Sequence, residues 1–238
     1  TSKYKGTVLG LYERLKTFKP VKYGGVVHFS EGPVIISRSP ELFFKVDNDG
    51  NISTRPMKGT LPRGKNAQED ESLKRWLSTD PKNRAENLMI VDLLRNDISR
   101  ISKVGSVHVP ELFTVETYET VLQMVSEVRA KLLDQLSIKD LFTALFPCGS
   151  ITGAPKIRAM EVIRDVEPEA RDVYCGSMGW ISPQGSMSFN VCIRTLSLFQ
   201  DGNVRLNVGG GIVHDSTART EYEEALWKAR YAKLPQQI

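Results

Sequence analysis

One lysine of the sequence stands in a setting that could present its amine to a ligand at a fixed place. Lys58 lies between a proline and a glycine, in the segment Arg55-Pro56-Met57-Lys58-Gly59-Thr60. Proline fixes its own φ angle and removes a donor, and glycine opens conformations that are closed to other residues, so this stretch is too irregular for a helix. A Pro/Gly loop that carries a solvated lysine is the simpler interpretation of these six residues alone, and they favour it.

Three glutamates are placed where they could serve a metal ion. Glu221 and Glu224 stand one helical turn apart, and Lys228 shares their face. Two carboxylates in this arrangement suit a hard divalent cation, which takes oxygen ligands. Glu86 shares a helical face with apolar residues, where a buried carboxylate needs a partner or a metal. Solvated side chains remain the alternative for both patterns, with Glu86 reaching water from the edge of its apolar stripe.

Three further features could bind an anion. Residues 147–155 form a turn of small residues that contains Ser150 and Thr152 and leads into a helix, whose first N–H groups attract anions. A plain helix N-cap is an equally good interpretation of this turn. Arg194 falls in the middle of a predicted strand, where an arginine more often points to solvent. Residues 209–211 are three consecutive glycines, at which backbone can approach a bound group closely.

The pattern of apolar and turn residues predicts the elements that position these groups. Helices are expected over residues 7–18, 67–77, 81–101, 138–146, 156–166 and 218–232, the first with Leu11, Leu15 and Phe18 on its apolar stripe. Hairpins are expected over residues 23–38, 42–55 and 174–199, and further strands at 106–109, 112–118, 121–128 and 204–208. Glu41 and Lys58 flank the outer ends of the hairpin over 42–55, and paired strands bring such ends close in space.

Composition limits the class of protein and partner. The chain has 238 residues, enough for one large domain or two small ones, and its 40% hydrophobic and 25% charged residues are ordinary for a soluble globular protein. The net charge of +4 is mild and no run of like charge occurs, so neither nucleic acid nor a membrane is expected as a partner. This mild positive charge is equally compatible with an anionic small molecule as the substrate. Three widely spaced cysteines argue for a reducing compartment, and we expect a cytoplasmic protein.

Seven blocks of the chain, in order, resemble the chorismate-utilising enzymes, a family that includes anthranilate, aminodeoxychorismate, isochorismate and salicylate synthases. The resemblance runs from about Leu11 to Ala232 and is very specific in combination. The blocks are Ser39-Pro40-Glu41, Arg55-Pro56-Met57-Lys58-Gly59-Thr60, Ala85-Glu86-Asn87 with Asp92-Leu93-Leu94-Arg95-Asn96-Asp97, Gly149-Ser150-Ile151-Thr152-Gly153-Ala154-Pro155-Lys156, Ile193-Arg194-Thr195, Gly209-Gly210-Gly211-Ile212-Val213 and Glu221-Tyr222-Glu223-Glu224.

The second block distinguishes the branches of the family. Its Pro-Met-Lys-Gly-Thr resembles the aminodeoxychorismate branch, whereas the anthranilate branch typically has alanine where this chain has Lys58. The resemblance therefore implies amination of chorismate at C4, the step that leads to p-aminobenzoate and folate. Anthranilate synthase component I and a catalytically incomplete chorismate-binding fragment remain the alternatives. Gln123 departs from the family, because many relatives have a histidine there, and an amide cannot hold a proton as an acid would.

The resemblance also implies a role for each candidate residue. Lys58 would be the nucleophile that attacks chorismate, Glu41 the acid that protonates the departing hydroxyl, and Thr60 a hydrogen-bonding group beside the ring. Mg²⁺ would be held by Glu86, Glu221 and Glu224, and would bind one substrate carboxylate. The groups that would bind the other carboxylate or line the site are Ser150, Thr152, Tyr174, Arg194, Gly209, Gly210, Gly211 and Lys228.

The fold and the partner follow from the same resemblance. The family fold is α+β, with stacked antiparallel β-sheets and helices on their outer faces. We expect residues 1–238 to be one chorismate-binding catalytic domain, the C-terminal portion of a longer protein and an N-terminally incomplete version of that fold. The second substrate would be ammonia, supplied by a glutamine amidotransferase subunit or fused domain.

Overall fold

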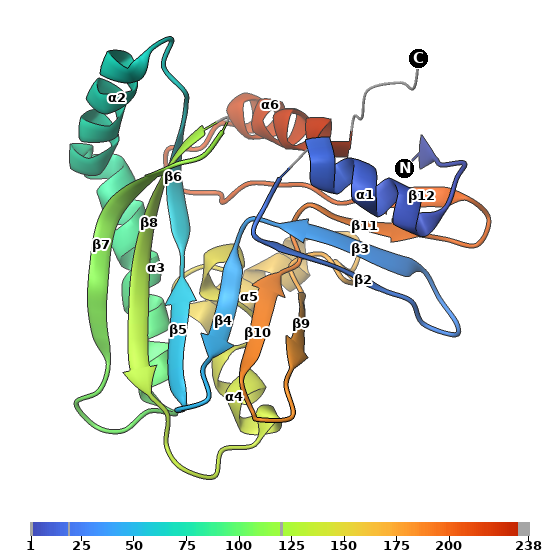
Figure 1. The fold of residues 1–238 in the computed structure, drawn as a ribbon. Helices are drawn as coiled ribbons and strands as arrows, with labels where there is room; N and C mark the ends of the chain where they lie inside the picture. Colours follow the sequence, from blue (N-terminus) through green and yellow to red (C-terminus); the bar gives the residue numbers. More distant parts are fainter. Residues whose placement is uncertain (1, 19, 120, 233–238) are drawn as a thin grey trace. The chain divides into compact units, whose positions relative to one another are not determined.

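The computed structural model describes residues 2–18, 20–119 and 121–232 (Figure 1). These residues form two compact units, each with a sheet of its own. The first unit comprises the described residues of Thr1–Glu41, Glu169–Gly179 and Asn190–Ile238, and the second comprises those of Leu42–Pro168 and Trp180–Phe189. No helix in the described ranges combines the length and the apolar character needed to cross a bilayer.

The first unit contains a five-stranded antiparallel sheet in the order β1-β12-β11-β3-β2. Its strands are β1 (Ser2–Lys3), β2 (Tyr23–Val27), β3 (Val34–Ser39), β11 (Thr195–Leu198) and β12 (Asn203–Leu206). Helix α1 (Val8–Phe18) packs against β3. It buries Leu11 and Leu15, as the apolar stripe predicts, but Phe18 is 49% exposed because the helix ends there. Helix α6 (Ala218–Ala229) and the short η2 (Arg230–Ala232) are the last two elements of this unit in chain order.

The second unit is built on a seven-stranded sheet in the order β6-β8-β5-β4-β10-β9, with β7 also paired to β8. The strands of this sheet are β4 (Leu42–Val46), β5 (Asn51–Arg55), β6 (Met57–Pro62), β7 (His108–Thr117), β8 (Val121–Lys131), β9 (Ser177–Ile181) and β10 (Met187–Val191). The first three residues of β9 and the last two of β10 belong to the first unit. Every pairing with a defined register, in either sheet, is antiparallel. The predicted α+β class with antiparallel sheets is therefore confirmed.

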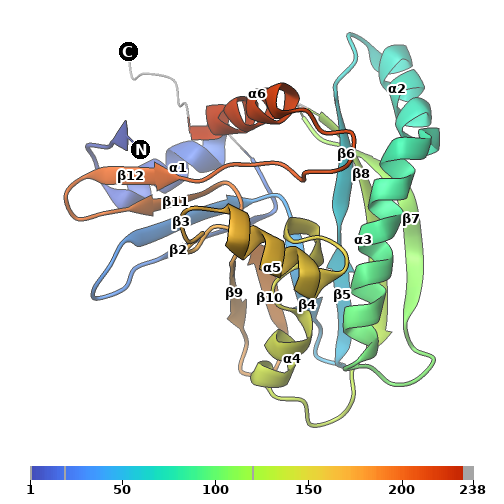
Figure 2. The ribbon, with the colours of Figure 1, turned by 180° about the vertical axis from the view of Figure 1, so that it is seen from behind.

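Helices lie on one face of this second sheet (Figure 2). They are α2 (Ala67–Thr79), α3 (Pro81–Ser99), α4 (Ile138–Leu145) and α5 (Lys156–Val166), with a short η1 (Gly149–Ile151) between the last two. Alternate residues of β8, Leu122 and Met124, are fully buried and form a cluster with Leu77 of α2. Truncating one such core leucine to alanine typically costs about 2–5 kcal/mol of stability. Helix α3 also lies along β8 and β6, and this packing fixes the site residues on those elements.

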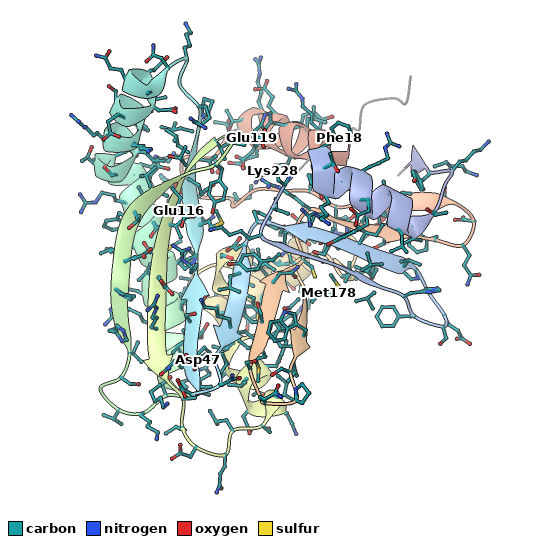
Figure 3. All side chains as sticks on the ribbon, viewed as in Figure 1. Phe18, Asp47, Glu116, Glu119, Met178 and Lys228 are labelled. Atoms are coloured by element: carbon teal, nitrogen blue, oxygen red, sulfur yellow. The ribbon has the colours of Figure 1, made fainter. Side chains whose placement is uncertain are left out.

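The opposite side of β8 carries charged residues towards the C-terminal end of the strand. Arg55 of β5 donates to Glu111 and Glu116 of β7, both at 2.9 Å, and Glu127 of β8 lies 3.9 Å from its Nε. Glu127 is only 3% exposed, and Arg129 forms a second ion pair with it at 2.8 Å. Figure 3 labels Glu116, which belongs to β7. Because buried carboxylates need charged partners, this network fixes the register of the three strands on that face.

Three expectations for individual segments are wrong. Lys58 lies in strand β6, not in a loop. The predicted strand over 186–199 is interrupted, because Arg194 has a φ of 51° and separates β10 from β11. The strands expected at 106–109 and 112–118 form one strand, β7, whose register shifts twice before Thr114. In each case, pairing with other strands determines where a strand begins, ends or breaks. A local residue pattern does not show which strands will be neighbours.

The hairpin predicted over 42–55 is confirmed. Leu42 pairs with Arg55 at its outer end. At the tip, Asp47 accepts hydrogen bonds from the backbone N–H groups of Asp49 and Asn51, at 3.0 and 2.8 Å. Gly50 has a φ of 75°, a conformation open to glycine at no steric cost.

A carboxylate holds the exit of β6 against α2. Asp70, in the first turn of α2, accepts from Arg63 Nε at 2.9 Å and from the backbone N–H of Gly64 at 2.7 Å. The same guanidinium donates to the carbonyl oxygen of Tyr118 at 2.8 Å. The hydrogen bond from Arg63, and then the one from Gly64, lower the pKa of Asp70 below its usual value.

This ion pair predicts an acid-sensitive contribution to stability. A carboxyl whose pKa is lowered by folding stabilises the folded chain above the unfolded value, about 3.9, and loses that contribution as the pH falls towards the lower folded value. We expect the melting temperature of the wild type to exceed that of Asp70→Asn at pH 7, with the gap shrinking below about pH 4. Thermal melts followed by circular dichroism from pH 7 to pH 3 measure this. Asp92→Asn, which removes an exposed ion pair on α3, is the control. A gap that is independent of pH would contradict the assignment.

Candidate active site

Helix α6 brings three of the predicted residues together in the first unit. Thr217 caps the helix and forms a reciprocal capping box with Thr220, which fixes where the first turn begins. Lys228 forms an ion pair with Glu224 at 2.6 Å and donates to the carbonyl oxygen of Gly209 at 2.8 Å. Figure 3 labels Lys228 on this helix. The lysine therefore ties the glycine run to the helix that carries the glutamates.

Glu221 has two oxygens in different environments. Oε1 accepts a hydrogen bond from the hydroxyl of Ser216 at 2.6 Å. Oε2 is buried and has no hydrogen-bond partner among the described residues. A Cβ atom placed on Gly210 would lie 2.7 Å from this Oε2 and 3.5 Å from Glu224 Oε1. The glycine therefore leaves room beside two carboxylates, one of which has an unused oxygen.

These groups fit a divalent cation. A buried carboxylate oxygen without a partner is costly, and a cation bound there would remove that cost. Carboxylate oxygens are the ligands that Mg²⁺ takes. The described residues contain no cluster of three His, Cys, Asp or Glu side chains that could hold a metal ion. Glu221 and Glu224 thus supply a pair, and Glu86, the third predicted ligand, belongs to the other unit.

Tyr174 and Arg194 lie in the same unit as the glycine run. The Tyr174 hydroxyl oxygen lies 3.2 Å from the position that a Cβ of Gly209 would take, so a side chain at Gly209 would crowd it. Arg194 is part-buried at the break between two strands, where its carbonyl oxygen accepts from the N–H of Arg38 at 3.2 Å. Burial lowers the pKa of Arg194, and the charges of Tyr231 and Glu41 oppose that shift. The expected solvent-facing alternative for Arg194 is therefore wrong.

Glu41 precedes the first strand of the hairpin and is 6% exposed. Its backbone N–H donates to the hydroxyl of Ser39 at 3.2 Å, and its carbonyl oxygen accepts from the N–H of Val191 at 3.1 Å. These bonds fix the backbone on which the carboxyl stands. The Ser39-Pro40-Glu41 block thus supplies both an acid and its support.

Lys58 stands on an irregular part of β6 in the second unit. The register between β6 and β8 shifts between Met57 and Thr60, and Gly59 within that shift has a φ of 91°. Thr60 donates to Gln123 Oε1 at 2.7 Å, and Gln123 Nε2 donates to the carbonyl oxygen of Gly59 at 2.9 Å. The amide of Gln123 therefore clamps the residues that follow Lys58, which gives this departure from the family a structural role.

Helix α3 lies against the same irregularity. A Cβ on Gly59 would come within 2.9 Å of Asn83 Oδ1, so the glycine allows the helix to approach. One turn further along α3, Glu86 is half-buried. Its neighbour Asn87 is completely buried and accepts from the hydroxyl of Ser126 of β8 at 2.6 Å. This bond fixes the rotation of the helix, and with it the direction of Glu86.

The segment over 147–155 is held against α3. Gly149 lies so close to Leu93 that a Cβ there would be 2.6 Å from the leucine Cδ2. Lys156, the first residue of α5, forms an ion pair with the buried Asp97 of α3. Thr152 donates to the carbonyl oxygen of Cys148 at 3.1 Å, and the Ser150 hydroxyl lies 3.2 Å from the Cys148 sulfur. Pro155 occupies the N-cap of α5 and no side chain caps it, so the N-cap interpretation is wrong.

The structure thus gathers the predicted residues in two groups. In the first unit are Glu41, Tyr174, Arg194, Gly209, Gly210, Gly211, Glu221, Glu224 and Lys228, and in the second are Lys58, Thr60, Glu86, Ser150 and Thr152. Sequence reasoning missed the structural roles of Ser216 and Asn83. Ser216 stands just before the N-cap Thr217, where a serine is easily taken for part of the cap. Asn83 stands three residues before Glu86 on the same helical face, and this spacing is the signal that indicates it.

Comparison with known proteins gives this arrangement a context. Aminodeoxychorismate synthase component 1 of Klebsiella aerogenes is 46% identical over 228 residues, which are 96% of this chain and 50% of that protein. Anthranilate synthase component 1 of Aquifex aeolicus is 41% identical over 228 residues, 96% of this chain and 46% of that protein. The crystal structure of anthranilate synthase component I from Streptococcus pneumoniae superposes with a TM-score of 0.87 at 37% identity, covering 98% of this chain and 51% of that one.

The chain therefore spans about half the length of the relatives it matches. The sequence profile of the chorismate binding enzymes matches residues 1–233, almost all of the chain. On this match, and on a fold shared with solved members, the chain belongs to the family of chorismate binding enzymes.

Proposed function

We propose that the full-length protein aminates chorismate at C4, the reaction of an aminodeoxychorismate synthase, with Lys58 as the nucleophile. The observation that carries this proposal is the setting of Lys58. It stands in the Pro-Met-Lys-Gly-Thr block, beside a backbone irregularity that Gln123 clamps through Thr60 and Gly59. Several relatives at 46% identity are named aminodeoxychorismate synthase component 1, which supports the same branch.

In the proposed reaction the neutral Lys58 amine attacks C2 of chorismate. The ring double bond shifts, and the C4 hydroxyl leaves as water with a proton from Glu41. Ammonia then attacks C4, the double bond shifts back, and the bond between C2 and the lysine nitrogen breaks, which returns the neutral amine. The new ammonium group at C4 gives its extra proton to the Glu41 carboxylate, which restores the acid. Covalent catalysis of this kind divides one difficult displacement into two easier ones. Thr60, already hydrogen-bonded beside Lys58, is proposed to orient the ring.

Chorismate carries two carboxylates, and we assign each a set of protein groups. Glu221, Glu224 and Glu86 would hold Mg²⁺, which when bound supplies positive charge for one carboxylate. Arg194, with its planar fork of donors, would bind the other together with Tyr174 and the backbone of residues 209–211. Lys228 contributes through its bonds to Glu224 and Gly209, which fix the glycine run on α6. Ser150 and Thr152 would line the site.

The source of ammonia and the compartment are also proposals. The words "component 1" in the relatives' names support a second component, for which a glutamine amidotransferase subunit or fused domain has the required chemistry. A cytoplasmic location is in keeping with the buried cysteines Cys148, Cys175 and Cys192, which are thiols and not disulfides.

Anthranilate synthesis is the second candidate, supported by the 41% identity and by the superposition on a solved anthranilate synthase. The product distinguishes the two candidates. We expect the full-length protein, given chorismate, Mg²⁺ and ammonium, to form aminodeoxychorismate, and Lys58→Ala to lose on the order of 10³-fold or more in rate, as expected when a nucleophile is removed. Liquid chromatography with mass detection separates the products.

The exposed Lys45 of strand β4, in the same sheet as Lys58, offers the control Lys45→Ala, for which we expect wild-type turnover. Anthranilate as the main wild-type product would show that Lys58 does not specify amination at C4. A full-length protein that binds chorismate without turning it over would support the non-catalytic alternative.

The cation proposal predicts a strong effect of adding one methyl group at Gly210. The new Cβ would lie 2.7 Å from Glu221 Oε2 and displace that carboxylate. We expect Gly210→Ala to weaken Mg²⁺ binding to the full-length protein by about 10–100-fold, the range seen when the groups that support a metal ligand are disturbed. Isothermal titration calorimetry measures the affinity. Gly32→Ala, in the β2–β3 turn, is the control for a glycine-to-alanine change that meets no neighbour within 4 Å; its φ of 101° makes it a backbone-strain control, for which we expect lower stability and unchanged Mg²⁺ affinity. Unchanged Mg²⁺ affinity in Gly210→Ala would place the cation elsewhere.

A further inference from the structure

We propose that Ser216 makes the cation site selective for magnesium over calcium, because it occupies one of the two oxygens of Glu221. This inference rests on the proposed function, in which Glu221 is a ligand of Mg²⁺. It concerns a residue outside the predicted site, in the turn between the glycine run and α6.

The hydroxyl of Ser216 is fixed in both of its hydrogen-bonding directions. Its oxygen accepts from the backbone N–H of Val213 at 3.0 Å, and the N–H of Ser216 donates to the Val213 carbonyl oxygen at 3.0 Å. A serine hydroxyl has a single proton to donate. That proton goes to Glu221 Oε1, 2.6 Å away, a short hydrogen bond of the kind formed with an ionised acceptor.

This arrangement leaves Glu221 with one available oxygen. Oε1 is engaged by Ser216, and Oε2 is buried without a hydrogen-bond partner among the described residues. Oε2 faces the open space at Gly210, where Glu224 Oε1 is also near. To offer both oxygens to the same ion, the carboxylate would have to share Oε1 between the ion and the Ser216 hydroxyl or rotate away from that hydroxyl.

One available oxygen favours the smaller ion. Ca²⁺ takes six to eight oxygen ligands at about 2.3–2.6 Å and often binds a carboxylate through both of its oxygens. Mg²⁺ demands octahedral geometry at about 2.0–2.1 Å, keeps several waters and is usually bound through one or two carboxylates. A glutamate that binds through one oxygen is the kind of ligand Mg²⁺ uses beside its waters, whereas the hydrogen-bonded second oxygen is a poorer ligand for Ca²⁺.

The neighbouring hydroxyls offer a matched comparison. Thr217 and Thr220 form the capping box of α6, and neither donates to Glu221. Thr220→Ala therefore perturbs the start of the same helix and leaves the contact between Ser216 and Glu221 intact. Ser216→Thr keeps the hydroxyl, whereas Ser216→Ala removes it.

The test is the ratio of the calcium and magnesium dissociation constants, measured by isothermal titration calorimetry on the full-length protein freed of metal. We expect the wild type to favour Mg²⁺. Ser216→Ala should weaken Mg²⁺ binding by about 10–100-fold and Ca²⁺ binding by less, so that the preference falls by about tenfold. Ser216→Thr and Thr220→Ala should keep the wild-type ratio. Melting curves identify any variant that fails to fold, and Ser216→Cys, whose thiol is a weak donor, then takes the place of Ser216→Ala.

The outcomes separate this inference from the proposed function. A wild type that binds Mg²⁺, with an unchanged ratio in Ser216→Ala, overturns the role of Ser216 and leaves the proposed function standing. A wild type that binds neither ion overturns both. A ratio that changes equally in Thr220→Ala would assign the effect to the helix start and would also overturn the role of Ser216.

Discussion

The presentation of Lys58 depends on the hydrogen bonds that Gln123 makes from β8 to β6. A strand that carries a proline, a register shift and a glycine with positive φ within a few residues would pair poorly with its neighbour by itself. The Gln123 amide restores the missing pairing, because it donates to Gly59 and accepts from Thr60. Such bonds contribute only about 1 kcal/mol each, but a buried amide left without partners would cost about 1–3 kcal/mol. The clamp therefore fixes the backbone that presents Lys58.

The first unit meets a different constraint, the accommodation of two carboxylates beside a backbone. Glycine at 210 leaves the space, Lys228 compensates the charge of Glu224, and Ser216 orients Glu221. Each partner leaves Glu221 Oε2 unused, so the unit holds a costly group that a cation would satisfy. Functional sites commonly retain such a locally unfavourable arrangement because the ligand completes it.

Much of this could be predicted from the sequence, and the failures have physical causes. Helical periodicity predicts α2, α3 and α4 correctly, since each buries one face. The prediction is also correct for α5, although none of its residues is buried. The hairpin at Asp47 was predictable because its turn chemistry is local. Lys58 was mistaken for a loop residue and Arg194 for a mid-strand residue because both depend on strand neighbours far away in the chain. The role of Ser216 could not be predicted either, since a serine before a helix has the same sequence appearance whether it caps the helix or supports a ligand.

The most direct test of the account is whether chorismate becomes attached to Lys58. The full-length protein would be incubated with chorismate and Mg²⁺ in the absence of ammonia, quenched in acid, digested and analysed by tandem mass spectrometry. The account predicts an adduct equal to chorismate minus water on the peptide that contains Lys58, and its disappearance when ammonium is added before the quench. An adduct on another residue, or turnover to aminodeoxychorismate by Lys58→Ala at the wild-type rate, would contradict it.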